Sequence, residues 1–460
     1  MSTNNKIIAG LDIGTTKICV IVGQLAENGK INILGVGKAS SQGGVSRGMV
    51  ANITKVVNAI NEAVDEAMRV SQVKINTVYV GIAGHHIKSM QHSGTLTRRN
   101  GEDEITIDEL NTLENEMGRI SMPSGQEILH ILPQDYKIDG EEGIRDPVGR
   151  IGVRVECNYH IISGEIQSAK VIGKAVQSAT LSVADLVVEP VASATAVLSE
   201  AEMEAGVALV DIGGGTTDIC IFENGYIAHT AIIPIGGDRI TRDLQEAFGI
   251  LKEQAEEVKV KYGSCYPIDS MKNEVVVIPG LPNRQSKEIS VYAISQVIRA
   301  RMEDIIQKVD FEIQLSRLGT KLYGGVVLTG GGSSMKEISQ LFSYYTGLEV
   351  HLGSPGQHLG RGMIDEVRNP MYATGIGLVM KGIESEQNFG SEFKSNERIK
   401  AKSETVDQEP IEAVVEEEQM QQVNNEKKTT WIKSPYQGLR MFGDFFQTFL
   451  SDNEHEDFKN

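Results

Sequence analysis

The sequence has few cysteines, and none of them forms a Cys-x-x-Cys pair. Only four cysteines occur among the 460 residues. Cys19 and Cys220 occupy matching positions in two similar segments, and Cys157 lies in another apolar run. We therefore expect reduced thiols buried in the core.

Long apolar runs and an excess of positive charge are also absent. No stretch of about 18 apolar residues occurs, and the segment from Met1 to Lys6 is polar. We therefore expect neither a membrane-spanning helix nor a secretory signal, and a protein that stays in the cytosol. The 44 Lys and Arg are outnumbered by 62 Asp and Glu, which gives a net charge of −18. This balance argues against a general nucleic-acid binder.

The most informative stretch is Asp211-Ile-Gly-Gly-Gly-Thr-Thr-Asp218, which lies between two apolar runs. This pattern predicts a strand, a glycine-rich turn and a second strand. Such a turn lets backbone N–H groups approach phosphate oxygens, and the threonines add hydroxyl donors. An acidic residue at its mouth would repel a triphosphate unless a cation lay between them, which suggests Mg²⁺ held largely through water. An ordinary glycine hairpin is the alternative.

The same pattern occurs near the N-terminus, as Leu11-Asp-Ile-Gly-Thr-Thr-Lys-Ile-Cys-Val20. The two segments match at Asp, Ile, Gly, Thr, Thr, Ile and Cys once two glycines are treated as an insertion. A chance hairpin does not recur in this way. We infer two related domains that clamp one nucleotide in the cleft between them, and a length of 460 residues leaves room for about three domains.

The regular pattern of strands and helices is interrupted after Gly84 and resumes near Ser168. Within this interval we predict a helix over about 108–120, after the N-cap candidate Thr106, and strands over 128–137 and 152–162. These elements suffice for a small α+β subdomain, although a long decorated loop is the alternative. The histidines of this interval lack metal-ligand spacing, and we interpret them as structural.

Three further features complete the predicted site. Glu189 is the one carboxylate at the end of a predicted strand, and it could simply end that strand. Glu256 and Lys259 lie three residues apart on one face of a predicted helix, where a surface ion pair is possible. The turn after the strand Val326 to Thr329 contains Gly330, Gly331 and Gly332, small enough for the backbone to pass beneath a purine and ribose.

The C-terminal part of the chain has a different composition. Glu, Lys, Gln, Asn and Ser dominate from about residue 386 to Lys428, which predicts a disordered tether. A predicted helix then gathers apolar side chains on one arc, and it requires an apolar surface, either a bilayer interface or a partner groove. We favour the membrane. The residues predicted to bind it are Trp431, Leu439, Phe442, Phe445, Phe446, Phe449 and Leu450.

The doubled hairpin resembles the actin-type ATPase superfamily, which includes actin, the DnaK-type chaperones and the sugar kinases. The order of parts, with an insert directly after Gly84 and a terminal amphipathic helix, resembles the FtsA family of bacterial cell-division proteins. This resemblance implies an α/β, actin-like two-domain ATPase fold with an inserted small α+β subdomain and a disordered C-terminal tether ending in an amphipathic helix. It implies a first domain over residues 1–84, 166–204 and 371–385, interrupted by the inserted subdomain over residues 85–165. It implies a second domain over residues 205–236 and 318–370, with a small subdomain over residues 237–317. A linker over residues 386–428 and the terminal helix over residues 429–452 follow.

The resemblance also implies ligands and partners. It implies ATP with Mg²⁺ as cofactors, slow or negligible hydrolysis, and self-association into filaments. It implies binding of the C-terminal tail of the tubulin-like protein FtsZ at the small subdomain, contacts between the insert and later division proteins, and attachment to lipids at the cytoplasmic face of the membrane at the division site. The implied nucleotide contacts are Asp12, Gly14, Thr15, Thr16, Lys17, Asp211, Gly213, Gly214, Gly215, Thr216, Thr217, Glu256, Lys259, Gly330, Gly331, Gly332 and Ser333, with Asp12 and Asp211 near the metal and Glu189 as the catalytic candidate.

Two other classes of function remain open at this point. A sugar-kinase-like phosphotransferase would need polar groups in the cleft to position a substrate hydroxyl, and the sequence does not identify them. A chaperone or pilus-assembly ATPase of the same superfamily is the other alternative.

Overall fold

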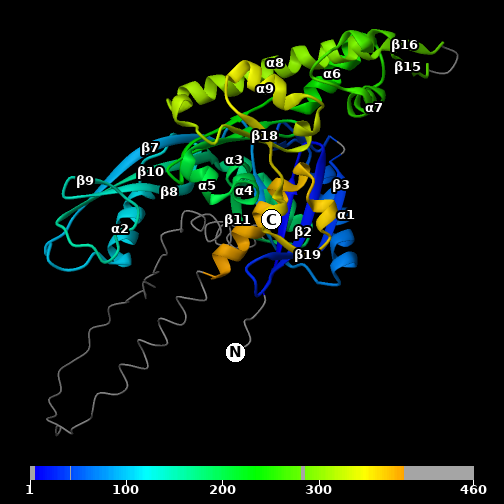
Figure 1. Ribbon diagram of the computed structural model, residues 1–460. Coiled ribbons are helices and arrows are strands. Elements are labelled where there is room, and N and C mark those ends of the chain that lie inside the picture. The colour runs from blue at the N-terminus through cyan, green and yellow to red at the C-terminus, as the bar shows by residue number, and fades with distance from the viewer. Residues whose placement is uncertain (1–5, 42, 281–284, 388–460) are drawn as a thin grey trace, which may run out of the picture.

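The computed structural model describes residues 6–41, 43–280 and 285–387. These residues form two α/β halves, each built on its own sheet, together with an inserted subdomain (Figure 1). The actin-like two-domain fold with an inserted α+β subdomain is confirmed. The predicted tether and terminal helix fall almost entirely on residues 388–460, outside the described residues.

The sheet of the first half has six strands in the order β11-β6-β1-β2-β3-β19. Alternating residues of its central strands face opposite cores. Val20 and Val22 face α1 and α3, whereas Cys19 and Ile21 face α4 and the helix over 373–387. The elements of this half are β1 (Ile7–Ile13), β2 (Lys17–Leu25), β3 (Ile31–Ser40), β4 (Val45–Ser46), β5 (Met49–Val50), α1 (Ile53–Ser71), β6 (Thr77–Ile82), α3 (Ile166–Ser178), β11 (Ser182–Val188), α4 (Glu189–Val197) and β19 (Leu359–Gly362).

The second half repeats the plan with a five-stranded sheet in the order β14-β13-β12-β17-β18. Its core buries the long helix α8, which contributes Met302, Ile305 and Val309. The elements are α5 (Glu200–Ala205), β12 (Val207–Ile212), β13 (Thr217–Glu223), β14 (Tyr226–Ile233), α8 (Val291–Leu315), β17 (Val326–Thr329), α9 (Ile338–Thr346), β18 (Val350–Leu352) and the short helices η2 (Gly319–Lys321) and η3 (Gly331–Ser334).

A small subdomain extends from this second half beside the cleft. Helices α6 and α7 pack against α8, and the hairpin β15-β16 lies at the outer end of the subdomain (Figure 1). The elements are α6 (Gly237–Phe248), α7 (Lys252–Tyr262), η1 (Asp269–Asn273), β15 (Val275–Ile278) and β16 (Lys287–Ser290). The helix predicted to carry Glu256 and Lys259 is present as α7.

The insert is a four-stranded antiparallel sheet with one helix on it. The strands run in the order β7-β10-β8-β9, and α2 packs on β7 and β8. Thr106 caps α2 through a complete capping box with Glu109, as its position predicted. The elements are β7 (Lys88–Thr97), α2 (Ile107–Met117), β8 (Gln126–Ile138), β9 (Glu141–Ile144) and β10 (Arg154–Glu165). The sequence predicted β8, β10 and α2 but missed β7 and β9, because most side chains of β7 are exposed and show no apolar alternation.

The chain returns to the first half at its C-terminal end. After η4 (Pro355–His358), α10 (Ile364–Val367) and η5 (Pro370–Tyr372), residues 373–387 form a helix. This helix crosses α4 with backbones in contact, since a Cβ at Gly377 would lie 1.9 Å from the carbonyl oxygen of Ala192. The C-terminal part of the described chain therefore packs directly on α4 of the first half. No helix among the described residues is long and apolar enough to cross a membrane.

Candidate functional site

The two glycine hairpins face each other across one cavity of about 450 Å³. Most of the residues predicted from sequence line it, although they come from β1-β2, β12-β13, α4, α7 and the turn after β17. They are Asp12, Gly14, Thr15, Thr16, Lys17, Glu189, Asp211, Gly213, Gly214, Gly215, Thr216, Glu256, Lys259, Gly330, Gly331 and Gly332. The fold thus gathers residues that lie more than three hundred positions apart.

The hairpins approach each other so closely that glycine is required in the second one. A Cβ at Gly214 would lie 2.1 Å from Thr16 Oγ1, and a Cβ at Gly215 would lie 2.3 Å from Thr15 Oγ1. Thr15 Oγ1 also accepts a hydrogen bond from the backbone N–H of Gly48 at 3.2 Å. The glycines therefore leave room for the threonine hydroxyls of the opposite half.

The second hairpin is also joined to the small subdomain. The backbone N–H groups of Gly237 and Asp238, at the start of α6, donate to the carbonyl oxygens of Gly213 at 2.9 Å and Gly214 at 2.8 Å. These bonds hold the hairpin carbonyls toward α6. Thr217, the first residue of β13, is fully buried, and its Oγ1 donates to the carbonyl oxygen of Ile235 at 2.8 Å instead of lining the cavity. Thr216, in the turn just before β13, lines the cavity.

Asp12 and Lys17 form an ion pair at the rim of the first hairpin. Lys17 Nζ lies 3.2 Å from Asp12 Oδ2 and 5.1 Å from the centre of the Tyr372 ring. Burial opposes the charge on Lys17, but the nearby Asp12 carboxylate outweighs it and raises the pKa of Lys17 above its ordinary value. Lys17 therefore carries a firm positive charge beside the cavity.

The carboxylate of Asp211 is held from the first half. Ser193 Oγ donates to Asp211 Oδ2 at 2.6 Å, and Thr374 Oγ1 lies 3.3 Å from the same oxygen. Burial raises the pKa of Asp211 to about 6, because the hydrogen bond from Ser193 offsets only part of the cost of the charge. Ser193 and Thr374 were not predicted, since a hydroxyl that supports a carboxylate has no local sequence signal.

Two more acids complete a carboxylate cluster with Asp12 and Asp211. Burial, and then the charges of these neighbours, raises the pKa of Glu189 and of Asp218 well above their usual values. Asp218 lines the cavity, and its Oδ1 is a buried oxygen with no hydrogen-bond partner among the described residues. Sequence reasoning did not select Asp218, although it occupies the place in the second hairpin that Lys17 occupies in the first.

This cluster fits a hydrated cation better than a cage of protein ligands. Among the described residues, no three His, Cys, Asp or Glu side chains come close enough to hold a metal by themselves. Mg²⁺ typically keeps several waters and takes one or two carboxylates together with phosphate oxygens. Buried acids facing a glycine-lined cavity provide such an environment, so the residues present fit Mg²⁺.

The far end of the cavity is formed by α7 and the turn after β17. Lys259 Nζ donates to Glu256 Oε2 at 2.7 Å, to Thr241 Oγ1 at 2.9 Å and to the carbonyl oxygen of Gly237 at 3.2 Å. The side chain of Lys259 is 11% exposed and that of Glu256 41%. The pair is therefore part of a half-buried network at the cavity wall rather than a free surface ion pair.

The turn after β17 passes directly behind Asp211. Gly330 has φ of +82°, and a Cβ there would lie 2.1 Å from Asp211 Oδ1, so both its backbone conformation and its neighbour require glycine. Ser333 corrects the prediction, because it is fully buried and its Oγ donates to the carbonyl oxygen of Gly330 at 2.7 Å. Ser334 lines the cavity in its place.

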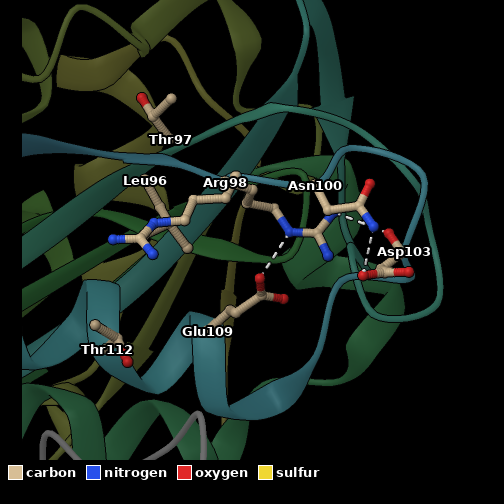
Figure 2. Close-up of a pocket in the computed structure, with 8 residues that line it drawn as sticks. Leu96, Thr97, Arg98, Asn100, Asp103, Glu109 and Thr112 are labelled. Atoms are coloured by element: carbon tan, nitrogen blue, oxygen red, sulfur yellow. Dashed lines mark hydrogen bonds and ion pairs between the residues drawn. The ribbon is translucent and has the colours of Figure 1, made fainter.

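A second cavity, of about 400 Å³, lies in the insert beside α2. Figure 2 shows the Arg98 guanidinium pointing toward the Glu109 carboxylate, with Asn100 and Asp103 paired beside it. Arg98 Nε lies 2.7 Å from Glu109 Oε1, and the guanidinium also donates to the carbonyl oxygens of Asp103, Glu104 and Gly152. Only 4% of the Arg98 side chain is exposed. This arginine therefore ties three segments of the insert together.

We expect Arg98→Ala to destabilise the insert by about 3 kcal/mol, because it leaves buried carbonyl oxygens and a carboxylate without their donor. The neighbouring Arg99→Ala is the matched control, since Arg99 is exposed, and it should change stability by less than about 0.5 kcal/mol. Hydrogen exchange over residues 85–165 measures the difference. Equal exchange in the two variants would contradict the structural role of Arg98.

Family models match two parts of this chain. A family model described as "Cell division protein FtsA" matches residues 208–377, and one described as "SHS2 domain inserted in FTSA" matches residues 84–163. The cell division protein FtsA of Pseudomonas aeruginosa is 37% identical over 400 residues, which cover 86% of this chain and 95% of that protein. The chain belongs to the FtsA family.

Other FtsA proteins support the same assignment. Escherichia coli FtsA is 33% identical over 400 residues, 85% of this chain and 94% of that protein, and Bacillus subtilis FtsA is 32% identical over 376 residues, 82% and 83%. Among solved structures, a PilM-PilN type IV pilus biogenesis complex matches with a TM-score of 0.60 and 17% identity, covering 82% of this chain and 98% of that one. MreB5 of Spiroplasma citri bound to ADP matches with a TM-score of 0.52 and 14% identity, covering 84% and 98%. These two likenesses concern the fold alone.

The residues predicted to bind the membrane, from Trp431 to Leu450, lie outside the described residues.

Proposed function

We propose that this FtsA-family protein binds Mg-ATP in the cavity between its halves, self-associates, and tethers FtsZ filaments to the cytoplasmic membrane at the division site, where it helps to recruit later division proteins. The observation that carries the nucleotide part is the cavity itself, with a glycine hairpin from each half and five acids on its wall. Family membership supports the role in cell division.

Different residues of the cavity would contact the phosphates, the cation and the nucleoside of the bound nucleotide. Backbone N–H groups of the hairpins and the charge of Lys17 would bind the phosphates. Asp12 and Asp211 would orient the waters of Mg²⁺, which neutralises phosphate charge when bound. Gly330, Gly331 and Gly332 would lie against the purine and ribose, opposite Glu256 and Lys259.

Glu189 explains why we expect turnover to be slow or negligible. It lies at the first position of α4 and lines the cavity, so it could orient a water toward the terminal phosphate. Burial and three neighbouring carboxylates raise its pKa well above the usual value. A raised pKa disfavours the charged carboxylate that a general base requires. We therefore expect ATP to act mainly as a bound ligand that sets the conformation of the protein, with little hydrolysis.

Each proposed partner is assigned to one part of the chain, as the family resemblance suggests. The small subdomain over residues 237–317 would receive the FtsZ tail, and the insert would contact a second copy and later division proteins. Actin-like subunits that associate head to tail form open filaments, because such contacts do not close. The C-terminal segment from Trp431 to Leu450 would bind lipid.

Recruitment of FtsZ to lipid vesicles tests the proposal. We expect the full-length protein, with Mg-ATP, to bring purified FtsZ to vesicles in a flotation assay, at least about 10-fold above vesicles alone. FtsZ that lacks its C-terminal tail is the control and should stay in solution, since the tail is the part proposed to bind. Equal recruitment of the two forms of FtsZ would contradict the assignment of the tail.

A further inference from the structure

The insert contacts the second half as well as the first. It leaves the first half after β6 and returns to it at α3, yet its strands β7, β8 and β10 lie against β14. Within the described part of the chain, β14 is the edge strand of the second sheet and pairs with β13 alone. The insert therefore covers a sheet edge that belongs to the other half.

A bulge in β14 provides the acceptors for this contact. Ile221 pairs with His229 and Phe222 pairs with Ile227, so Ala228 is an extra residue in β14. A bulge leaves backbone groups without partners in the ladder. Gln91 Nε2 from β7 donates to the carbonyl oxygen of Ala228 at 2.7 Å, and Gln134 Nε2 from β8 donates to that of Ile227 at 2.6 Å. Two glutamines of the insert thus satisfy the bulge.

The contact continues along β14. Ser89 Oγ donates to the carbonyl oxygen of Thr230 at 2.9 Å, and His160 Nε2 lies 3.0 Å from Thr230 Oγ1. His160 is 1% exposed, and its Nδ1 lies 3.1 Å from Gln91 Nε2. Burial lowers the pKa of His160 to about 3, so the ring stays neutral at physiological pH. We call Ser89, Gln91, Gln134 and His160, with the β14 segment that they contact, the β14 interface.

Apolar packing reinforces these hydrogen bonds. Ile227 and Ile232 of β14 are half-buried against the core cluster of the first half that includes Ile87, Leu129 and Ile162. An ion pair between Arg145 of the insert and Glu204 of α5 lies nearby, but both side chains are about half exposed, at 54% and 52%, so it adds little. Neutral amide donors and a few apolar contacts make an interface that can open without leaving a buried charge.

The β14 interface is separate from the connection between the halves at the floor of the cavity. There, Ser193 and Thr374 bind Asp211 on β12, and α4 crosses the C-terminal helix. β14 lies two strands away from β12, which is about 10 Å across the sheet. Two bodies joined at two separated places cannot rotate freely about either one.

We propose that the insert is a clasp between the two halves: its β14 interface restrains their relative movement and thereby slows exchange of the ligand held in the cavity. A partner that binds the insert and displaces Gln91 or Gln134 would release this restraint. The restraint itself does not depend on which ligand the cavity holds, whereas its effect on ligand exchange rests on the proposed binding of ATP.

The double variant Gln91→Ala, Gln134→Ala in the full-length protein tests the clasp. We expect amide exchange over residues 226–233 to accelerate about 10-fold or more, since both hydrogen bonds to the bulge are lost, one exposed and one partly buried. Fluorescence transfer between labels at Glu62→Cys on α1 and Tyr344→Cys on α9 should broaden, and release of a fluorescent ATP analogue should speed up by a similar factor. The described native cysteines are buried, so the labels report the chosen positions.

Asn158→Ala is the matched control. Its amide bonds to Asp135 and accepts from Ser93, all within the insert, so β14 exchange and the transfer signal should stay as in the parent protein. If the double variant melts early, Gln134→Glu replaces it, because the carboxylate keeps the size of the side chain but removes the donor. Unchanged β14 exchange and unchanged transfer in a folded variant would overturn the clasp. Faster β14 exchange without any binding of the analogue would uphold the clasp and contradict only the proposed nucleotide.

Discussion

Replacement of Asp12 by alanine is expected to lower the affinity for Mg-ATP by about 100-fold or more, which corresponds to about 2.7 kcal/mol. Asp12 has two tasks in the cavity. It forms the ion pair with Lys17 at 3.2 Å, and it would orient a water of the cation. Removing it leaves Lys17 without its partner and the cation with fewer acceptors. Isothermal titration calorimetry with and without Mg²⁺ measures the change.

The dependence on Mg²⁺ provides the control for this prediction. If Asp12 acts through the cation, EDTA should weaken ATP binding in the parent protein and have little further effect in Asp12→Ala. Asp65→Ala, which removes an exposed carboxylate from α1, should bind like the parent protein. Parent-like affinity in Asp12→Ala would remove this residue from the site.

Gly214→Val tests the same cavity through shape. The new Cβ would lie 2.1 Å from Thr16 Oγ1, so the hairpins would have to move apart and the phosphate contacts would be lost. Gly319→Val is a control outside the cavity, because the nearest atoms to its Cβ lie 3.7 Å away. We expect ATP binding to disappear in the first variant and to persist in the second, with both proteins folded by circular dichroism.

The second large effect concerns the C-terminal segment. We expect Phe446→Asp, or truncation after Lys428, to release the protein from lipid vesicles while ATP and FtsZ binding persist. Burial of Leu439, Phe442, Phe446, Phe449 and Leu450 would contribute roughly 1.5 to 3 kcal/mol each, about 8 to 15 kcal/mol before the cost of ordering the segment. One charge placed among these side chains opposes insertion directly.

The proposed self-association would make this effect larger. A single segment should bind weakly, whereas many copies along a polymer bind together, and avidity can exceed single-site affinity by about 10² or more. Gln447→Asp is the matched control, since it introduces the same charge on the polar arc of the predicted helix. Flotation with vesicles measures all forms. Membrane binding by the protein truncated after Lys428 would show that the attachment lies elsewhere in the chain.

The insert illustrates what sequence patterns reveal and what they omit. Thr106 predicted the start of α2 because an N-cap is a local arrangement, and the structure adds Glu109 as the second member of a capping box. β7 was missed because its side chains are mostly exposed, and its place at the edge of the sheet is set by pairing with β10, more than 50 residues later. A helix cap can be predicted from a few consecutive residues, whereas the pairing of strands that are distant in the chain cannot.

The sequence by itself determined the doubled hairpin, its glycines and its acids, since a turn that holds phosphate needs particular residues at fixed spacing. Tertiary structure alone decided which side chains reach the cavity. Thr216, in the turn, lines the cavity, whereas Thr217 does not, because the pairing of β13 buries it and its Oγ1 binds the Ile235 carbonyl oxygen. It also decided that Asp218 joins the acid cluster and that Gln91 binds β14. These contacts depend on how segments distant in the chain pack together, and a local sequence pattern does not predict that packing.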